Sequence, residues 1–151
     1  MKALLQRAAG SSVTVNGEVI GEIEQGLVVF LGVAESDGEK DADFLAEKIV
    51  NMRVFSDAGG KFNLSALDIK AGLLVISQFT LLADTRKGRR PSFTLAAPPD
   101  KAESLYLYIV ACLERSGLKV QTGRFGAHML VRIINDGPVT IMIDSRDKFS
   151  V

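Results

Sequence analysis

The sequence predicts a single α/β domain in which mixed sheets carry helices on one face, a three-layer α/β/β arrangement with barrel-like curvature. Two short apolar runs, at 26–33 and 73–83, are typical of buried strands. Two helical patterns, at 39–54 and 98–116, each follow one of these runs. Because further strand patterns precede and follow this alternation, we expect the extra strands to form a second layer, with a closed barrel-like sheet as the alternative.

The other elements follow from local patterns. The dipeptide Asn16-Gly17 predicts a tight hairpin turn. The second helix has prolines at its start, acidic residues in its first turn and Gly117 just past its end. The strands are predicted at 1–8, 13–15, 18–23, 26–33, 73–83, 118–122, 129–135 and 139–144, with a turn at 56–61 and a basic loop at 86–92.

The composition is that of an ordinary globular protein. The chain has 151 residues, of which 47% are hydrophobic and 24% are charged, so we expect one domain over 1–151 with a proper core. The lone cysteine, Cys112, cannot form an internal disulfide, which favours a reducing compartment. Because the N-terminus lacks a signal-peptide pattern and no apolar run could cross a bilayer, we expect a cytoplasmic protein without a membrane partner.

The charge of the chain limits how it could bind nucleic acid. Its 18 basic and 18 acidic residues give a net charge of zero, which argues against a protein held on nucleic acid by a large positive field. The densest basic cluster consists of Arg86, Lys87, Arg89 and Arg90. It is either a solvated loop or a phosphate contact in which Gly88 lets the backbone approach closely.

Two polar segments could carry chemistry. Ser77, Gln78, Phe79 and Thr80 lie in an apolar run, where buried hydroxyls and amides need partners. They could form a pocket floor that faces a developing oxyanion, although the spacing alone favours an ordinary strand end. The segment 135–140, Asn-Asp-Gly-Pro-Val-Thr, reads first as a turn; the alternative is an unusual Gly-Pro backbone.

Familiar catalytic patterns are missing from the sequence. His128 is the one histidine, and no GxSxG motif supports a nucleophilic triad. One histidine and one cysteine make a Cys/His metal site improbable, so we expect no metal and no cofactor. Residue types alone therefore do not name a reaction.

The two polar segments nevertheless resemble the signature motifs of D-aminoacyl-tRNA deacylases, as SQFTL at 77–81 and NDGPVT at 135–140. The resemblance covers the whole chain, and Ala8, where the family pattern has valine, is a departure in core size only. The other matching residues are Gln6-Arg7, Gly26-Leu27, Phe55, Asp57, Gly60-Lys61, Ala83-Asp84-Thr85, Lys87-Gly88, Arg90-Pro91-Ser92-Phe93, Thr122-Gly123 and Phe125-Gly126-Ala127.

The resemblance implies a homodimer that binds aminoacyl-tRNA, not DNA, with active sites at the subunit interface. It implies that Gly137-Pro138 is cis and reaches into the partner's pocket as a chirality filter, whereas the segment from Ser77 to Thr80 lines that pocket. It also implies that no side chain is an obligatory nucleophile and that the terminal ribose 2′-hydroxyl assists hydrolysis. Because glycine has no side chain to exclude, we expect glycyl-tRNA to be cleaved as well.

Two rival hypotheses remain at this point. One is an esterase that forms an acyl-enzyme on Thr80 or Ser77, which predicts a trappable covalent intermediate. The other is a non-enzymatic nucleic-acid-binding module that uses the basic residues from Arg86 to Arg90, which predicts binding without turnover.

Overall fold

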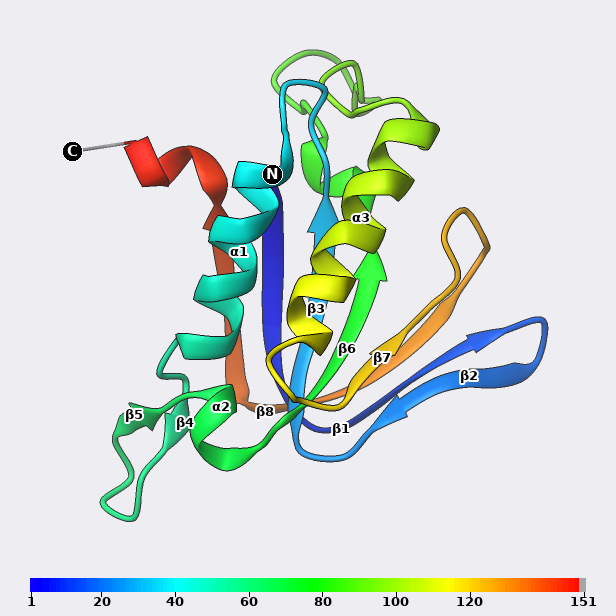
Figure 1. The fold of residues 1–151 in the computed structure, drawn as a ribbon. Helices are drawn as coiled ribbons and strands as arrows, with labels where there is room; N and C mark the ends of the chain where they lie inside the picture. Colours follow the sequence, from blue (N-terminus) through cyan, green and yellow to red (C-terminus); the bar gives the residue numbers. More distant parts are fainter. Residues whose placement is uncertain (150–151) are drawn as a thin grey trace.

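The computed structural model describes residues 1–149, and their main strands form one curved mixed sheet with two long helices on one side (Figure 1). The helices are α1 (Glu39–Asn51), α2 (Ala66–Ile69) and α3 (Pro99–Glu114), with the 3₁₀ helices η1 (Phe79–Leu82) and η2 (Ser145–Phe149). The strands are β1 (Lys2–Val15), β2 (Glu18–Ile23), β3 (Gly26–Gly32), β4 (Phe55–Ser56), β5 (Phe62–Leu64), β6 (Gly72–Ser77), β7 (Val120–Thr122) and β8 (Leu130–Asp144).

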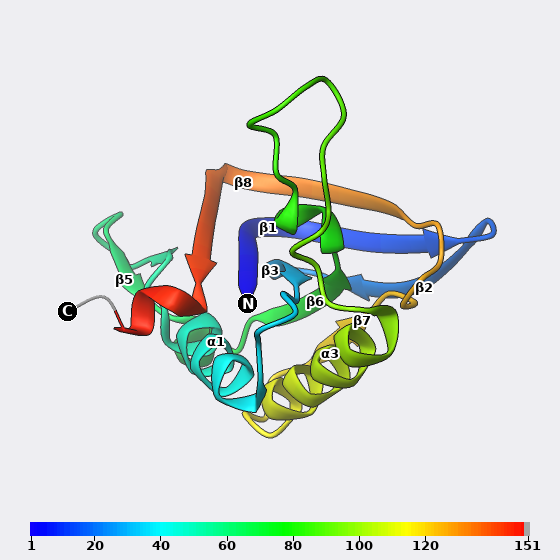
Figure 2. The ribbon, with the colours of Figure 1, turned by 90° about the horizontal axis from the view of Figure 1, so that it is seen from above.

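The sheet has the order β2-β1-β3-β6-β7, and β8 pairs with β1. The strand β1 is antiparallel to β2, β3 and β8, whereas β3, β6 and β7 run parallel. Figure 2 shows how the sheet curls, and β2 comes into contact with β7, so that the sheet is nearly closed into a barrel. The predicted fold class, an α/β domain with a barrel-like mixed sheet and helices on one face, is therefore confirmed.

The two faces of the sheet bury two separate cores. Side chains alternate along a strand, so Leu73 and Val75 of β6 face the helices, where they pack with Leu45 of α1 and Ile109 of α3. Their neighbours, including Leu74 of β6, face the inside of the curve, and they form the second core. Burial on both faces explains why this strand is a continuous apolar run.

The predictions divided two strands that are continuous. Instead of strands at 1–8 and 13–15, β1 runs through Gly10, Ser11 and Ser12, because this polar stretch pairs with β2 and β8. Likewise, β8 continues through the segment predicted as a turn between 129–135 and 139–144. Hydrogen bonding to neighbouring strands outweighs the local turn composition at Gly10 to Ser12, and β8 pairs with β1 on both sides of residues 136–139.

The predicted strand at 73–83 is wrong beyond Ser77. Its partner β3 ends at Gly32, and the last pair in the ladder joins Leu31 to Ser77. Without a neighbouring strand, the rest of the run forms η1. The predicted helices were too long by a few residues, and β4, β5 and α2 were not predicted.

No helix within residues 1–149 is long and apolar enough to cross a membrane.

One buried hydrogen bond attaches α3 to the sheet, since the hydroxyl of Tyr106 donates to the carbonyl of Val75 at 2.8 Å. Burial raises the pKa of Tyr106 to about 12.

We predict that Tyr106→Phe lowers the free energy of unfolding by about 1 kcal/mol, because it removes this bond and leaves the ring in place. Urea unfolding measures the change. The matched control is Tyr108→Phe on the same helix α3, which removes a more exposed hydrogen bond to Asp43 of α1 and should cost less than about 0.5 kcal/mol. Equal losses in the two variants would contradict the assignment.

Candidate functional site

The segment from Ser77 to Thr80 lies at the carboxyl end of β6, where the strand passes into η1. The amide of Gln78 donates to the carbonyl of Leu31 at 2.7 Å, which is the last tie to β3. Above β3, η1 packs directly on Gly32: a Cβ there would lie 2.4 Å from Leu82 Cδ2 and 3.1 Å from the carbonyl of Gln78. A glycine at this position is thus what allows the segment to fold over the sheet.

A cavity of about 430 Å³ opens beside this segment. Ser77, Gln78 and Phe79 line it, whereas Thr80 lies next to it and accepts a 2.5 Å hydrogen bond from Gln78 Nε2. The rest of the lining is mostly aromatic and small apolar side chains: Leu31, Val33, Phe93, Ala96, Ala97, Pro99, Ala102, Tyr106 and Phe125, with Gly126. Such a pocket suits a flat or apolar ligand group that is fixed by a few polar atoms.

The first turn of η1 offers hydrogen-bond donors near this cavity. The amides of Phe79 and Thr80 are the first of the helix, so they cannot bond within it, and no side chain caps this end in the part of the chain that the structure describes. Adjacent open amides are the kind of group that stabilises an oxyanion.

The segment around Gly137 is neither a simple turn nor regular strand. In the β1–β8 ladder, Thr140 pairs with Gln6 and Asn135 pairs with Ala8, so residues 136–139 stand out as a bulge. The Gly137-Pro138 peptide bond is cis, and Gly137 has φ of +129°, which favours glycine. Both residues are exposed, and Figure 2 shows that β8 turns a corner along its length.

We call residues 136–139 the corner. Sequence analysis gave no role to Arg7 of β1, which forms a hydrogen bond to the corner. Its Nε donates to the carbonyl of Asp136 at 3.0 Å, and its Nη1 donates to the carbonyl of Val54 at 2.9 Å. The guanidinium also lies 5.2 Å from the ring centroid of Phe62. Only 10% of the Arg7 side chain is exposed. An arginine in the mostly apolar strand predicted at 1–8 was the signal that could have revealed it.

One chain does not bring the two motifs together. The segment from Ser77 to Thr80 folds over Gly32, which pairs with Lys2, whereas Thr140 pairs with Gln6. Four residues along β1 correspond to about 13 Å at the ~3.3 Å rise of a strand. The corner therefore lies well away from the cavity of its own chain.

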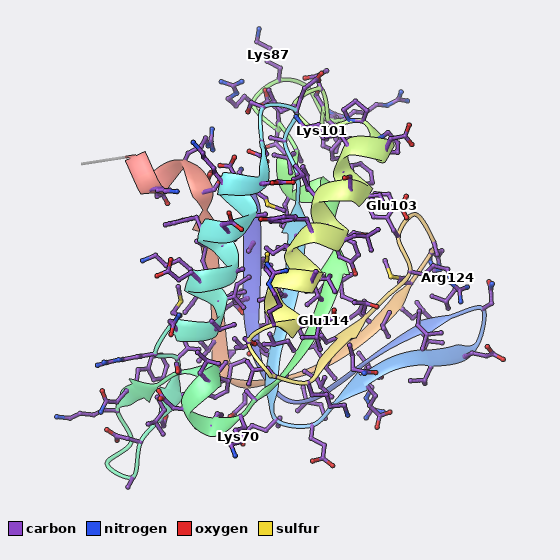
Figure 3. The ribbon with its side chains drawn as sticks, in the orientation of Figure 1. Lys70, Lys87, Lys101, Glu103, Glu114 and Arg124 are labelled. Atoms are coloured by element: carbon purple, nitrogen blue, oxygen red, sulfur yellow. The ribbon has the colours of Figure 1, made fainter. Side chains whose placement is uncertain are left out.

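The predicted basic loop is a small hairpin closed by the pairing of Asp84 with Ser92. Arg86 Nε and Nη2 donate to the Asp84 carboxylate at 2.9 and 2.7 Å, and this contact lowers the pKa of Asp84 to about 2. Arg86 is thus engaged within the hairpin, whereas Lys87, Arg89 and Arg90 are exposed around its tip. In Figure 3, Lys87 points outward from this end of the molecule.

His128 is exposed and lies outside the cavity lining. Among residues 1–149, no group of three or more His, Cys, Asp or Glu side chains is placed to hold a metal ion.

The chain matches known proteins over nearly its whole length. Residues 4–144 match the family described as D-Tyr-tRNA(Tyr) deacylase. The D-aminoacyl-tRNA deacylase of Dehalococcoides mccartyi is 57% identical over 150 residues, which are 99% of this chain and 98% of the relative. The chain belongs to the D-aminoacyl-tRNA deacylase family. This confirms the family resemblance and the enzyme class that it implied, a deacylase that is a hydrolase.

A further relative and two solved structures are also similar to this chain. The D-aminoacyl-tRNA deacylase of Thermosipho africanus is 52% identical over 149 residues, 99% of this chain and all of the relative. The solved structure of a protein named "c-Myc DNA Unwinding Element Binding Protein" is 42% identical with a TM-score of 0.89, covering 95% of this chain and 98% of the other. A structure of a probable eukaryotic D-amino acid tRNA deacylase, only 16% identical, has a TM-score of 0.85 over the same shares of the two chains.

Proposed function

We propose that the chain is a single deacylase domain, acting in the cytoplasm, that hydrolyses the ester of D-aminoacyl-tRNA to free tRNA and amino acid. The observation that carries the proposal is the aromatic cavity lined by Ser77, Gln78 and Phe79, next to the first turn of η1, where the amides of Phe79 and Thr80 have no bond within the helix. Aromatic walls suit the terminal nucleoside of an RNA, because bases stack on such rings.

The proposed reaction needs no protein nucleophile. Water attacks the ester carbonyl carbon, the two amides stabilise the oxyanion, and the tetrahedral intermediate collapses by breaking the bond to the ribose 3′ oxygen. That oxygen takes up a proton, and the amino acid leaves as its carboxylate. The 2′-hydroxyl on the same ribose assists the attack. An aminoacyl ester is already activated, so modest stabilisation of the oxyanion suffices.

Stereoselectivity is proposed to come from Gly137 and Pro138 of the partner subunit. If the carbonyl and the amine of the substrate are fixed, inverting the Cα exchanges its hydrogen and its side chain. A corner held by Arg7 and by Asn135, whose side chain accepts from the Val139 amide at 3.0 Å, would occupy the space of an L side chain. The exposed carbonyls of the corner could accept from the substrate ammonium group.

The sheet offers a surface for the second copy. On the face away from the helices, Phe30, Leu4 and Met142 form one row across β3, β1 and β8. Met142 is 49% exposed. Since the cavity and the corner are separated in one chain, a second copy on this face is proposed to bring the corner of each subunit to the cavity of the other.

RNA binding is proposed to use Lys87, Arg89 and Arg90, with Arg86 stabilising the hairpin that carries them. Three exposed cations on a chain of zero net charge produce only a small region of positive potential. Such a small positive region argues against extending to this chain the DNA binding for which one structural neighbour is named.

The primary test compares tyrosyl-tRNA in its D and L forms and glycyl-tRNA at one enzyme concentration. We predict rapid release from D-tyrosyl-tRNA and from glycyl-tRNA, because neither places a side chain against the corner, and negligible release from the L form. Equal release from both tyrosyl forms would leave an esterase without the proposed filter. Release from none would instead favour the binding module, and protected glycyl-tRNA would contradict steric exclusion.

We predict that Thr80→Ala keeps the deacylation rate constant within about tenfold of the wild type, because the amide of residue 80 remains. Single-turnover kinetics with D-tyrosyl-tRNA measures this, and mass spectrometry of the quenched reaction searches for an acyl-enzyme. Complete loss of activity in a folded variant, together with a covalent adduct on the wild type, would establish the Thr80 nucleophile instead.

For the dimer, we predict that Met142→Arg yields a chain with the sedimentation mass of a monomer and little deacylase activity. A charge in the apolar row opposes association, and a lone chain lacks the partner's corner. Leu107→Arg is the matched control, because Leu107 is 56% exposed on α3, across the sheet from this row. A fully active monomer would refute the shared active site.

A further inference from the structure

Within residues 1–149, the ring of Phe79 has one aromatic neighbour, Phe93. The two ring centroids lie 5.0 Å apart and the planes meet at 70°, an edge-to-face contact. Phe79 is 57% exposed, so the rest of its surroundings constrain the ring little. The contact with Phe93 is therefore a main restraint on this side chain.

The backbone of Phe93 is itself fixed on both sides. Before it, Ser92 exchanges two hydrogen bonds with Asp84, of 2.8 and 2.9 Å, at the base of the basic hairpin. After it, the carbonyl of Phe93 accepts from the amide of Ala96 at 3.0 Å, and Ala96 pairs with Ala34 beyond the end of β3. Phe93 thus joins the hairpin to the loop after β3 and presents its ring to the cavity.

The helix that carries the two open amides is too short to hold its own orientation. η1 has four residues, of which Leu81 and Leu82 pack on Gly32 at its end and Phe79 packs at its start. At one end, Leu82 is buried against Gly32, where a Cβ would lie 2.4 Å from its Cδ2 atom. At the other end, Phe79 rests on Phe93. Loss of either anchor would let the amides of Phe79 and Thr80 turn away.

We propose that Phe93 is a positioning residue for deacylation, which acts through Phe79 to keep the Phe79 and Thr80 amides aimed at the reacting carbonyl. This inference rests on the proposed function. It also gives the basic hairpin a second role, because a hairpin that holds RNA at its tip holds the catalytic segment at its base.

The test is a double-mutant cycle with Phe93→Leu, Phe79→Leu and the combined variant, measured by single-turnover deacylation of D-tyrosyl-tRNA. We predict that each single change lowers the rate constant about tenfold, a larger effect than the accompanying loss of apparent substrate affinity. The combined variant should match Phe79→Leu, because the contact is already lost. Phe93→Tyr keeps the ring and should restore the wild-type rate. Leu95→Ala, in the same loop and 57% exposed, should leave it unchanged.

A second measurement does not depend on catalysis. Amide hydrogen exchange followed by NMR should be faster at Phe79 and Thr80 in Phe93→Leu than in the wild type, with little change elsewhere. Additive rate losses, or a weaker affinity at an unchanged rate constant, would show that Phe93 contacts the substrate directly and would overturn the inference. Unchanged exchange at the two amides would overturn it too. A wild type that leaves D-tyrosyl-tRNA intact would refute the proposed function, while the exchange result would still decide whether Phe93 orders η1.

Discussion

The pairing of β1 with β8 is the constraint on which the arrangement of the site depends. Because β1 is hydrogen-bonded along nearly its whole length, it fixes where each motif lies. The start of β1 pairs with the end of β3, over which η1 folds, and its middle holds the bulge of β8 through Arg7. The distance between the cavity and the corner is thus set by the span of β1 from Lys2 to Gln6, at the ~3.3 Å rise of a strand.

Much of the fold could be predicted because burial leaves a clear pattern. The runs at 26–33 and 73–83 are apolar on both faces, and the structure uses both faces, one against the helices and one inside the curve. The failures lie where neighbours decide the conformation. The polar stretch at Gly10 to Ser12 continues as strand since β2 and β8 pair with it, and the run after Ser77 leaves the sheet since β3 has ended.

Less of the candidate site could be predicted from the sequence, because its contacts join residues from distant parts of the chain. Ser77, Gln78 and Gly137 were singled out because they break local patterns, whereas the contacts that their partners make cannot be read from the sequence. Arg7 acts on Asp136 across 129 positions of sequence. Phe93 follows the basic hairpin, and its value lies in a ring contact with Phe79 that no spacing rule predicts. Family resemblance pointed to these residues, whereas only the fold shows what they touch.

The chemistry and the charge of the molecule are consistent with each other. A chain of zero net charge cannot hold RNA tightly through its general field, so the selectivity of a deacylase of this design has to come from the reacting end of the substrate. At that end, the base needs an apolar cavity and the ester needs oxyanion donors. The amine needs carbonyl acceptors, and the configuration at Cα is distinguished by a steric wall. In the proposed function, apolar side chains form the cavity, whereas the backbone supplies the oxyanion donors, the carbonyl acceptors and the steric wall. Backbone groups are indifferent to the identity of the side chain on the substrate, so this design favours discrimination by handedness over discrimination by amino acid.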